Sequence, residues 1–497
     1  MRPSTAGHSA GSTVLPRYPI LIDGEWRDVA QRPGIGSWNP ATEEEWYVIA
    51  DCAADDVDAA VRAAHRAFTE GPWPKLRPVE RGRLVCRIAD AVRANADRLA
   101  RTESIDCGKV ISETTGFVQV CADFLQFFGE LADKISGHTF TPPRPDLHAY
   151  TIRVPVGVVA AIVPWNNPLW LLALKLGPAL AAGNTVVIKP SEVCAAPVIE
   201  LLQGVLEAAD IPPGVINLVT GGGDPCGRAL TSHPLVSRIA FTGGPDTARH
   251  IVRNSAENLA EVSLELGGKS PALVFADADL DNAVDSIVSG VFLGSAGQSC
   301  VASSRAIVDR GIHDAFVERI AARATALRIG DPLDPASQLG PLATKAQYER
   351  VSKAVEAAIA DGAELVCGGR RPDHLDRGWY YAPTVLACPS HDRPIVQTEL
   401  FGPVLTVTPF SGEDEALRLA NDTRYGLAAG IFTRDLGRVH RLTPVIRAGI
   451  QYVNCYRMGA PMGPIGGFRD SGKSRESGID AVRDYTKPVT VWINTAV

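Results

Sequence analysis

Short apolar runs alternate with longer amphipathic stretches through the first half of the chain. The expected strands are apolar runs bounded by Gly, Pro or Asn, at residues 157–163, 185–189, 215–221 and 238–244. The expected helices cover residues 169–182 and 195–209, and Pro245 suits the first position of a third helix. Strands separated by helices predict a parallel, doubly wound α/β sheet, which binds ligands beyond the carboxyl ends of its strands.

A second alternation runs from about residue 271 to 449, with strand-like runs at 271–275 and 430–433, and it predicts a second α/β domain. The run 488–494 also predicts a strand, although no partner lies near it in the sequence. The most apolar stretch, residues 154–188, is interrupted by prolines, asparagines and Lys175. It therefore lacks the roughly 20 uninterrupted apolar residues that a membrane span needs.

Length and composition exclude several classes of protein. The chain has 497 residues, enough for two or three domains, and its net charge of -7 disfavours a nucleic-acid partner. Its ten cysteines form no CxxC pair and its ten histidines show no close pairing, so we expect neither a disulfide framework nor a metal site. The N-terminus lacks an apolar signal core, which indicates a flexible tail at residues 1–16 and a cytoplasmic protein.

Three segments carry candidate chemistry, and each also has a structural interpretation. Small neighbours around Cys300 in GSAGQSCVASSR would let a carbonyl reach the sulfur, although most single cysteines are structural. Glu265 precedes a Gly-Gly turn in ELGGKSP, as a general base in a cleft would, or as an ordinary surface glutamate would. Asn166 in PWNNP is a candidate oxyanion donor, with a helix N-cap as the alternative.

Taken together, these segments resemble the aldehyde dehydrogenase superfamily. The resemblance is carried by PWN at Pro164–Asn166, KPSE at Lys189–Glu192, Glu265–Lys269, GQSC ending at Cys300, and ELFGP at Glu399–Pro403. The motifs stand in the family's order, and the match runs from about Ile20 to the last strand.

The resemblance implies a stepwise mechanism on Cys300. Its thiolate attacks the aldehyde carbon, and the Asn166 amide and the Cys300 N–H hold the resulting oxyanion. Hydride then passes to a nicotinamide, and Glu265 activates the water that hydrolyses the thioester. Glu476, in SGKSRESG, matches a second family glutamate thought to relay protons.

The resemblance also implies the cofactor site. Lys189 and Glu192 match residues that bind the adenosine ribose, Glu399 and Phe401 flank the nicotinamide ribose, and Trp165 lies along the cofactor. Further expected cofactor contacts are Gly223, Gly243, Gly244 and Leu266. A carboxylate at Glu192 would repel a 2′-phosphate, so we expect NAD rather than NADP. Gly244 departs from the family pattern, which often has serine there.

A substrate tunnel is expected where the family has one. Its expected lining residues are Asn167, Trp170, Leu171, Leu174, Ser299, Val301 and Arg457. Members acting on simple aldehydes tend to have aromatic residues at several of these places. The amide of Asn167 and the cation of Arg457 suggest a polar or carboxylate-bearing aldehyde, with a structural salt bridge as the alternative for Arg457.

The implied organisation has three parts. The dinucleotide-binding domain would comprise residues 17–138 and 157–270, and the catalytic domain residues 271–470. Residues 139–156 and 484–497 would form a small β oligomerisation element in a homodimer or homotetramer. Three other functions stay open: an acylating enzyme that uses coenzyme A, although such enzymes typically lack Glu265; a cysteine hydrolase without a redox step; and a non-catalytic structural protein.

Overall fold

The predicted strands of the first half lie in one seven-stranded sheet of the computed structural model, which describes residues 15–496. The strand order is β11-β10-β7-β8-β9-β1-β2, parallel from β11 to β9, with β1 antiparallel to both of its neighbours. The strands are β1 (Ile20–Ile22), β2 (Glu25–Arg27), β7 (Val158–Val163), β8 (Thr185–Pro190), β9 (Ile216–Leu218), β10 (Val236–Thr242) and β11 (Glu261–Glu265).

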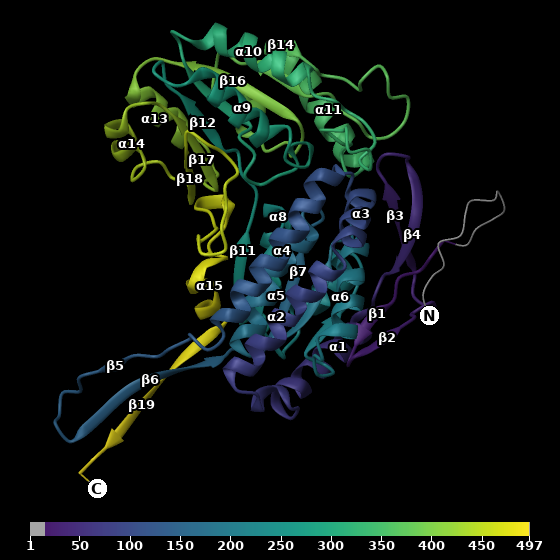
Figure 1. Ribbon diagram of the computed structural model, residues 1–497, viewed down its shortest axis with the longest axis vertical. Helices are drawn as coiled ribbons and strands as arrows, with labels where there is room; N and C mark the ends of the chain where they lie inside the picture. The colour runs from purple at the N-terminus through teal and green to yellow at the C-terminus, as the bar shows by residue number, and fades with distance from the viewer. Residues whose placement is uncertain (1–14, 497) are drawn as a thin grey trace.

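Strand β7 is apolar throughout because it is buried on both faces of the sheet. Val159 and Ala161 belong to the core on one face of the sheet, whereas Val158 and Ala160 belong to the core on the other. A strand buried on both faces shows no polar alternation. The helices on the first face are α2 (Pro78–Ala94), α3 (Ala96–Cys107), α4 (Ile111–Leu131), α5 (Pro168–Ala182) and α6 (Ala196–Ala208), and those on the second are α1 (Ala54–Thr69), α7 (Arg228–Thr231) and α8 (Pro245–Asn254) (Figure 1). The doubly wound fold is confirmed.

The second half of the chain builds a second seven-stranded sheet in the order β14-β15-β16-β13-β12-β17-β18, in which only the β14–β15 pair is antiparallel. Its strands are β12 (Pro271–Val274), β13 (Arg305–Asp309), β14 (Glu364–Cys367), β15 (Thr384–Ala387), β16 (Val404–Phe410), β17 (Ala428–Phe432) and β18 (Ile450–Val453). Its helices are α9 (Leu280–Val291), α10 (His313–Thr325), α11 (Lys345–Ala360), α12 (Pro394–Gln397), α13 (Glu413–Asn421) and α14 (Leu436–Leu442). This sheet forms the upper lobe of Figure 1.

A narrow arm extends from the first lobe and ends near the C-terminus (Figure 1). It is a three-stranded sheet of β5 (Thr139–Phe140), β6 (Leu147–Pro155) and β19 (Thr486–Asn494), which follows α15 (Gly478–Asp484). The C-terminal strand thus finds its partner in β6, antiparallel from Thr486↔Pro155 to Asn494↔Leu147. A separate hairpin joins β3 (Gly34–Asn39) to β4 (Glu44–Ala50).

The N-terminal tail expected at residues 1–16 falls mostly outside the described residues, which begin at 15. At its last residue, the Pro16 carbonyl accepts a hydrogen bond from the Val48 amide at 3.0 Å and so attaches the chain to the hairpin strand β4. Among residues 15–496, no helix combines the length and the apolar character that crossing a bilayer requires.

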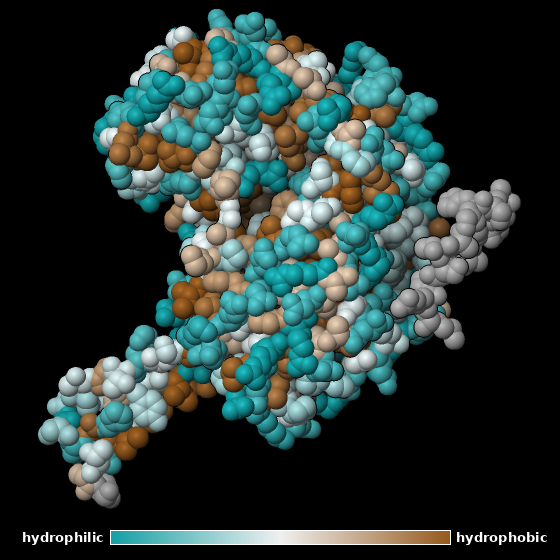
Figure 2. Space-filling model, in the orientation of Figure 1, coloured by the Kyte–Doolittle hydropathy of each residue, from teal (hydrophilic) through white to brown (hydrophobic). Residues whose placement is uncertain are grey.

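The two sheets meet so that the carboxyl ends of the first face the amino ends of the second. Asn166 follows β7 and Gly243 follows β10, the two strands at which the winding of the first sheet reverses. Cys300 precedes β13 and Glu399 precedes β16 in the second sheet. The space-filling view shows a recess between the two lobes (Figure 2). A crevice at a reversal point is where open α/β sheets bind ligands.

Candidate active site

Cys300 lies in the turn between α9 and β13, and its backbone packs against the ELGGK segment. A Cβ at Gly268 would overlap the Cys300 carbonyl oxygen, so only glycine allows this approach. On the other side the Tyr456 hydroxyl donates to the Val301 carbonyl at 2.9 Å. Small residues near the thiol therefore allow the backbone of neighbouring segments to approach the Cys300 loop closely.

The Cys300 thiol needs a base. Burial, reinforced by the carboxylates of Glu399 and Glu265, raises its pKa to about 12, although the N–H groups of Cys300 and Val301 act in the opposite direction. Among the residues that the structure describes, neither of these two N–H groups donates to a backbone carbonyl, and both act on the Cys300 sulfur. They therefore lie where an oxyanion develops, while the thiol stays protonated near neutral pH until a base removes its proton.

Asn166 reaches the same loop. Its side chain is 5% exposed, and its Nδ2 donates to the Gln298 carbonyl at 2.9 Å, two residues before Cys300. The N-cap interpretation of Asn166 is wrong, because Asn167 occupies the N-cap position of α5 and its side chain makes no capping bond. The amide of Asn166 is thus held beside the nucleophile by the loop itself, as an oxyanion donor must be.

Glu265 is the last residue of β11 and is buried. Burial, together with the nearby Glu476 carboxylate, raises the pKa of Glu265 well above its usual range, while Lys175 opposes the shift. The Ser474 hydroxyl lies 3.3 Å from Glu265 Oε1. A carboxylate with a raised pKa is a better general base than an exposed one.

Lys175 links Glu476 to this site, and sequence reasoning missed its role. Its Nζ donates to Glu476 Oε1 at 2.6 Å and to Thr242 Oγ1 at 2.7 Å, and the side chain is fully buried. Thr242 pairs with Glu265 across β10 and β11. The available signal was a single charge within the apolar helix 169–182, because a lysine is rarely buried without a partner.

The residues expected around the nicotinamide ribose come together. A Cβ at Gly267 would overlap the Glu399 carboxylate, and Glu399 Oε1 accepts from the Gly268 amide at 2.9 Å. Burial raises the pKa of Glu399 to about 7. The Trp165 and Phe401 rings meet edge to face, with centroids 5.3 Å apart.

The residues expected around the adenosine and phosphates also lie at strand ends. Lys189 Nζ is 3.9 Å from the half-exposed Glu192 carboxylate. Gly244 is the N-cap of α8, and a Cβ at Gly244 or at Gly223 would meet no atom within 4 Å, whereas Gly243 packs against the Phe241 ring. Leu266 is buried, and its amide bonds to the Ser471 carbonyl. An open helix N-terminus after β10, with a lysine and a carboxylate at the end of β8 in the same sheet, fits a dinucleotide.

The expected tunnel residues divide into two groups. Asn167, Leu171, Leu174 and Ser299 are buried, whereas Trp170 and Val301 are partly exposed. Asn167 Oδ1 accepts from the ammonium of Lys109, which is itself paired with Glu103 at 2.8 Å. The Trp170 indole packs between Phe117 and Phe124, with centroid distances of 5.8 and 5.9 Å.

Arg457 has a protein partner. Its Nη2 lies 3.3 Å from Glu113 Oε1, and Nη1 donates to the Ser289 carbonyl at 3.4 Å. This geometry is that of the structural salt bridge rather than of a cation left free for a substrate carboxylate. Within the described part of the chain, no group of three His, Cys, Asp or Glu side chains has the arrangement of a metal site.

Comparison with known proteins matches this geometry to one family. The model of the aldehyde dehydrogenase family matches residues 26–491. The chain belongs to the aldehyde dehydrogenase family. It is 46% identical over 480 residues to the (Z)-2-((N-methylformamido)methylene)-5-hydroxybutyrolactone dehydrogenase of Acinetobacter baylyi, covering 96% of this chain and 97% of that protein.

Solved structures agree with this assignment. A putative aldehyde dehydrogenase from Burkholderia cenocepacia matches with a TM-score of 0.93 and 42% identity, over 96% of this chain and 97% of that one. The NAD+ complex of an aldehyde dehydrogenase from Bacillus cereus matches with a TM-score of 0.93 and 35% identity, over 96% of each chain. The resemblance read from the motifs is confirmed: this aldehyde dehydrogenase is an oxidoreductase that converts an aldehyde into a carboxylic acid.

Proposed function

We propose that this enzyme oxidises a polar aldehyde, one that carries hydrogen-bond acceptor oxygens away from its reacting carbon, and that it uses NAD. The observation that carries the substrate class is a pair of N–H donors without acceptors at the start of α5. They belong to Asn167 and Trp170, which lie three residues apart and hence on one face of the helix.

The orientation of the Asn167 amide follows from its partner. Lysine can only donate, so the atom facing Lys109 is the oxygen, and Nδ2 points elsewhere. Among the described residues Nδ2 makes no hydrogen bond, and the Trp170 Nε1–H is buried without an acceptor. Leaving a buried donor such as the Trp170 N–H unpaired costs about 1–3 kcal/mol, which a substrate oxygen would offset.

The relative with 46% identity supports the same class, because the substrate in its name carries formamido, hydroxyl and lactone oxygens. A chain lined for simple apolar aldehydes would not hold an amide in place with a buried Lys109–Glu103 ion pair. Asn167 gives the Lys109 ammonium a second acceptor, whereas Glu103 Oε2 is buried without a hydrogen-bond partner.

The chemistry is assigned to five side chains. Glu265 takes the thiol proton, and the Cys300 sulfur bonds to the aldehyde carbon while Asn166 and the Cys300 N–H hold the oxyanion. The nicotinamide, when bound, supplies the acceptor for the aldehyde hydride. Glu265 then deprotonates the water that cleaves the thioester. The buried pair of Lys175 and Glu476 carries away the protons that Glu265 accepts.

NAD is proposed over NADP because of Glu192. Its carboxylate lies beside Lys189 and is half-exposed, so it can accept both ribose hydroxyls but would repel a 2′-phosphate. Two similar structures, an aldehyde dehydrogenase from Bacillus cereus and a betaine aldehyde dehydrogenase from Staphylococcus aureus, are NAD+ complexes, which supports the same assignment.

The substrate class is tested by rates on succinic semialdehyde, betaine aldehyde, benzaldehyde and hexanal. We expect the highest kcat/KM for succinic semialdehyde, whose carboxylate offers acceptors. Asn167→Leu should lower that value about tenfold and leave hexanal unchanged, because one hydrogen bond to a charged group is lost. Asn282→Leu, in the first turn of α9, is the matched control. Hexanal as best substrate, with unchanged ratios in Asn167→Leu, would end the proposal.

We also infer a homodimer or homotetramer that pairs through the arm. The outer edge of β19 pairs with no strand of the described chain, and the arm exposes apolar side chains. These are Phe140, Ile152, Val489, Trp492 and Ile493. Exposed edges and apolar patches are typical of subunit interfaces. Light scattering on the purified enzyme would contradict this by giving the mass of one chain.

A cytoplasmic location is inferred from the cysteines. All ten lie within the described residues and none is bonded to another. Free thiols in this number suit a reducing compartment.

A further inference from the structure

The loop that leads to Cys300 has a backbone that its sequence does not favour. Ser295 and Ala296 have φ of +50° and +52°, in the left-handed region. A non-glycine residue costs roughly 1–2 kcal/mol there, and two in succession need outside support. The loop sits between the end of α9 and the nucleophile, so a relaxation of these two residues would move Cys300.

Glu113 supplies such support from the other lobe. It stands in the first turn of α4, and both of its carboxylate oxygens lie 3.1 Å from the Ser295 amide nitrogen. The Ser295 hydroxyl also donates to Oε1 at 3.3 Å. Hydrogen bonds to a carboxylate are about twice as strong as neutral ones, so this contact pins the loop at its strained residue.

Arg457 is the second residue that supports the loop, and we call Glu113 and Arg457 together the bracket. Its guanidinium pairs with Glu113, and it lies flat over Gly294, where an added Cβ would come within 2.8 Å of the Arg457 Cζ. The side chains of Arg457 and Glu113 are 19% and 10% exposed, so water screens their attraction little. Arg457 also bonds to the Ser289 carbonyl of α9 and thereby joins three elements around the loop.

The bracket is connected to the reacting groups by two further hydrogen bonds. Gln298 Nε2 donates to the Ser295 carbonyl at 2.9 Å, and the Gln298 carbonyl accepts from Asn166 Nδ2 at 2.9 Å. The Gln298 Oε1 atom accepts from the Ala343 amide. A displacement of Ser295 is therefore passed to the oxyanion donor and to the thiol two residues beyond Gln298.

We propose that Glu113 and Arg457 are positioning residues: together they hold the Ser295–Ala296 turn and so place the Cys300 sulfur and the Asn166 amide for attack. The proposal rests on Cys300 being the nucleophile, but not on the substrate class or on the choice of NAD. It gives Arg457 a role that does not involve the substrate.

The test measures kcat, KM and the dissociation constant for NAD in Glu113→Ala, Glu113→Gln and Arg457→Met. We expect kcat of Glu113→Ala to fall about 10- to 100-fold with NAD binding unchanged, since a displacement of about 1 Å can cost a hundredfold. Glu113→Gln keeps an oxygen for the Ser295 N–H and should recover most of the loss. Arg457→Met should fall between these two variants.

Asp123→Ala is the matched control, because Asp123 pairs with Arg93 at 3.1 Å on the exposed side of the same helix. It should keep the parent kcat. If Glu113→Ala does not fold, Arg457→Met decides, since it leaves the Ser295–Glu113 bond in place. A parent-like kcat in a folded Glu113→Ala or Arg457→Met, with only the melting temperature lowered, would overturn the proposal, as would a matching loss in Asp123→Ala. An effect that is confined to KM would also overturn it.

Discussion

The two sheets are wound in the same way, yet the crevices at their reversal points differ. In the first sheet the reversal lies between β7 and β10, and the segments that follow these strands contain Asn166 and the glycines 243 and 244. In the second it lies between β12 and β17, and Asp277 stands there. Its carboxylate accepts from the Thr433 hydroxyl at 2.8 Å and from the Arg434 and Asp435 amides at 3.0 and 3.1 Å.

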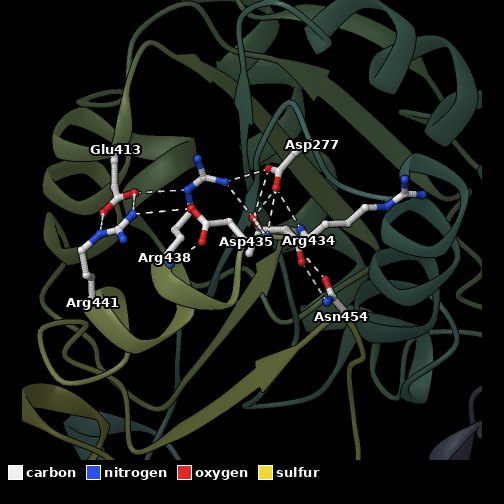
Figure 3. Close-up of polar contacts among 8 residues, drawn as sticks. Asp277, Glu413, Arg434, Asp435, Arg438, Arg441 and Asn454 are labelled. Carbon is white, nitrogen blue, oxygen red and sulfur yellow. Dashed lines mark hydrogen bonds and ion pairs between the residues drawn. The ribbon is translucent and has the colours of Figure 1, made fainter.

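At the second reversal point the charged side chains pair with one another (Figure 3). Arg438 donates to Asp277 at 2.7 Å and to Glu413 at 3.1 Å, and Glu413 also binds Arg441 at 2.9 Å. The Thr433 hydroxyl, the Arg434 and Asp435 amides and two nitrogens of Arg438 are thereby paired within the protein. The first crevice keeps open glycine positions and free N–H groups instead. The reversal of strand order creates a crevice in both sheets. A crevice binds a ligand only where it also offers polar groups that have no partner within the protein.

The largest expected effect on the difference between the two crevices comes from a change at the nucleophile. Cys300→Ser replaces the thiol by a far less acidic hydroxyl, which Glu265 cannot ionise to a useful extent. We expect kcat to fall at least about a thousandfold while NAD still binds with its normal dissociation constant. NADH absorbance with a saturating aldehyde and a cofactor titration measure the two quantities. Undiminished oxidation by this variant would contradict the assignment of the chemistry to the first crevice.

Removal of Asp277 should affect stability and spare catalysis. Asp277→Ala removes one acceptor from the Thr433 hydroxyl, from the Arg434 and Asp435 amides and from Arg438, and we expect the free energy of unfolding to fall by about 2 kcal/mol. Urea unfolding followed by fluorescence measures the loss. Asp373→Ala, which breaks the exposed pair with Arg370, is the control and should change stability little. A large fall in kcat for Asp277→Ala would mean that the second crevice serves the reaction.

Cofactor binding should depend on pH through Glu399. Burial raises its pKa to about 7, so the carboxyl is roughly nine-tenths protonated at pH 6 and one-tenth at pH 8. Only the ionised form accepts from both ribose hydroxyls, so the dissociation constant for NAD should tighten about tenfold between pH 6 and pH 8. Glu399→Gln should flatten this dependence. The same slope in that variant would assign it to another group.

The parts of the fold that can be predicted from the sequence are those that depend on the pattern of apolar and polar residues within one segment. The strand at 157–163 was placed within one residue because burial on both faces leaves a continuous apolar run that Pro164 ends. The pairing of residues 139–156 with 484–497 followed only from the family resemblance, since β6 lies more than three hundred residues before β19 and pairing over such a distance leaves no local sign.

The same limit applies to the site. The motifs located Cys300, Glu265 and Glu399, because small residues and glycines mark where backbones approach closely. They did not show that Lys175 meets Glu476, or that Glu113 meets Arg457, since each pair joins distant segments. For Arg457 the sequence left both a substrate cation and a structural salt bridge open, because its partner Glu113 on α4 is distant in the sequence.

The smallest expected effect concerns the open N-terminus of α8. Gly244 has φ −78° and ψ 149°, which suit serine, and an added Cβ would meet no atom within 4 Å. Gly244→Ser should add a capping oxygen and a hydroxyl beside the pyrophosphate, and tighten NAD binding about two- to fivefold. Calorimetric titration measures it, with Gly116→Ser, on the exposed side of α4 and equally free of contacts, as the control. Unchanged or weaker binding in Gly244→Ser alone would mean that the phosphates do not approach this helix end. The first crevice would then hold its cofactor by the ribose contacts of Glu192 and Glu399, and openness at α8 would not be what separates it from the crevice at Asp277.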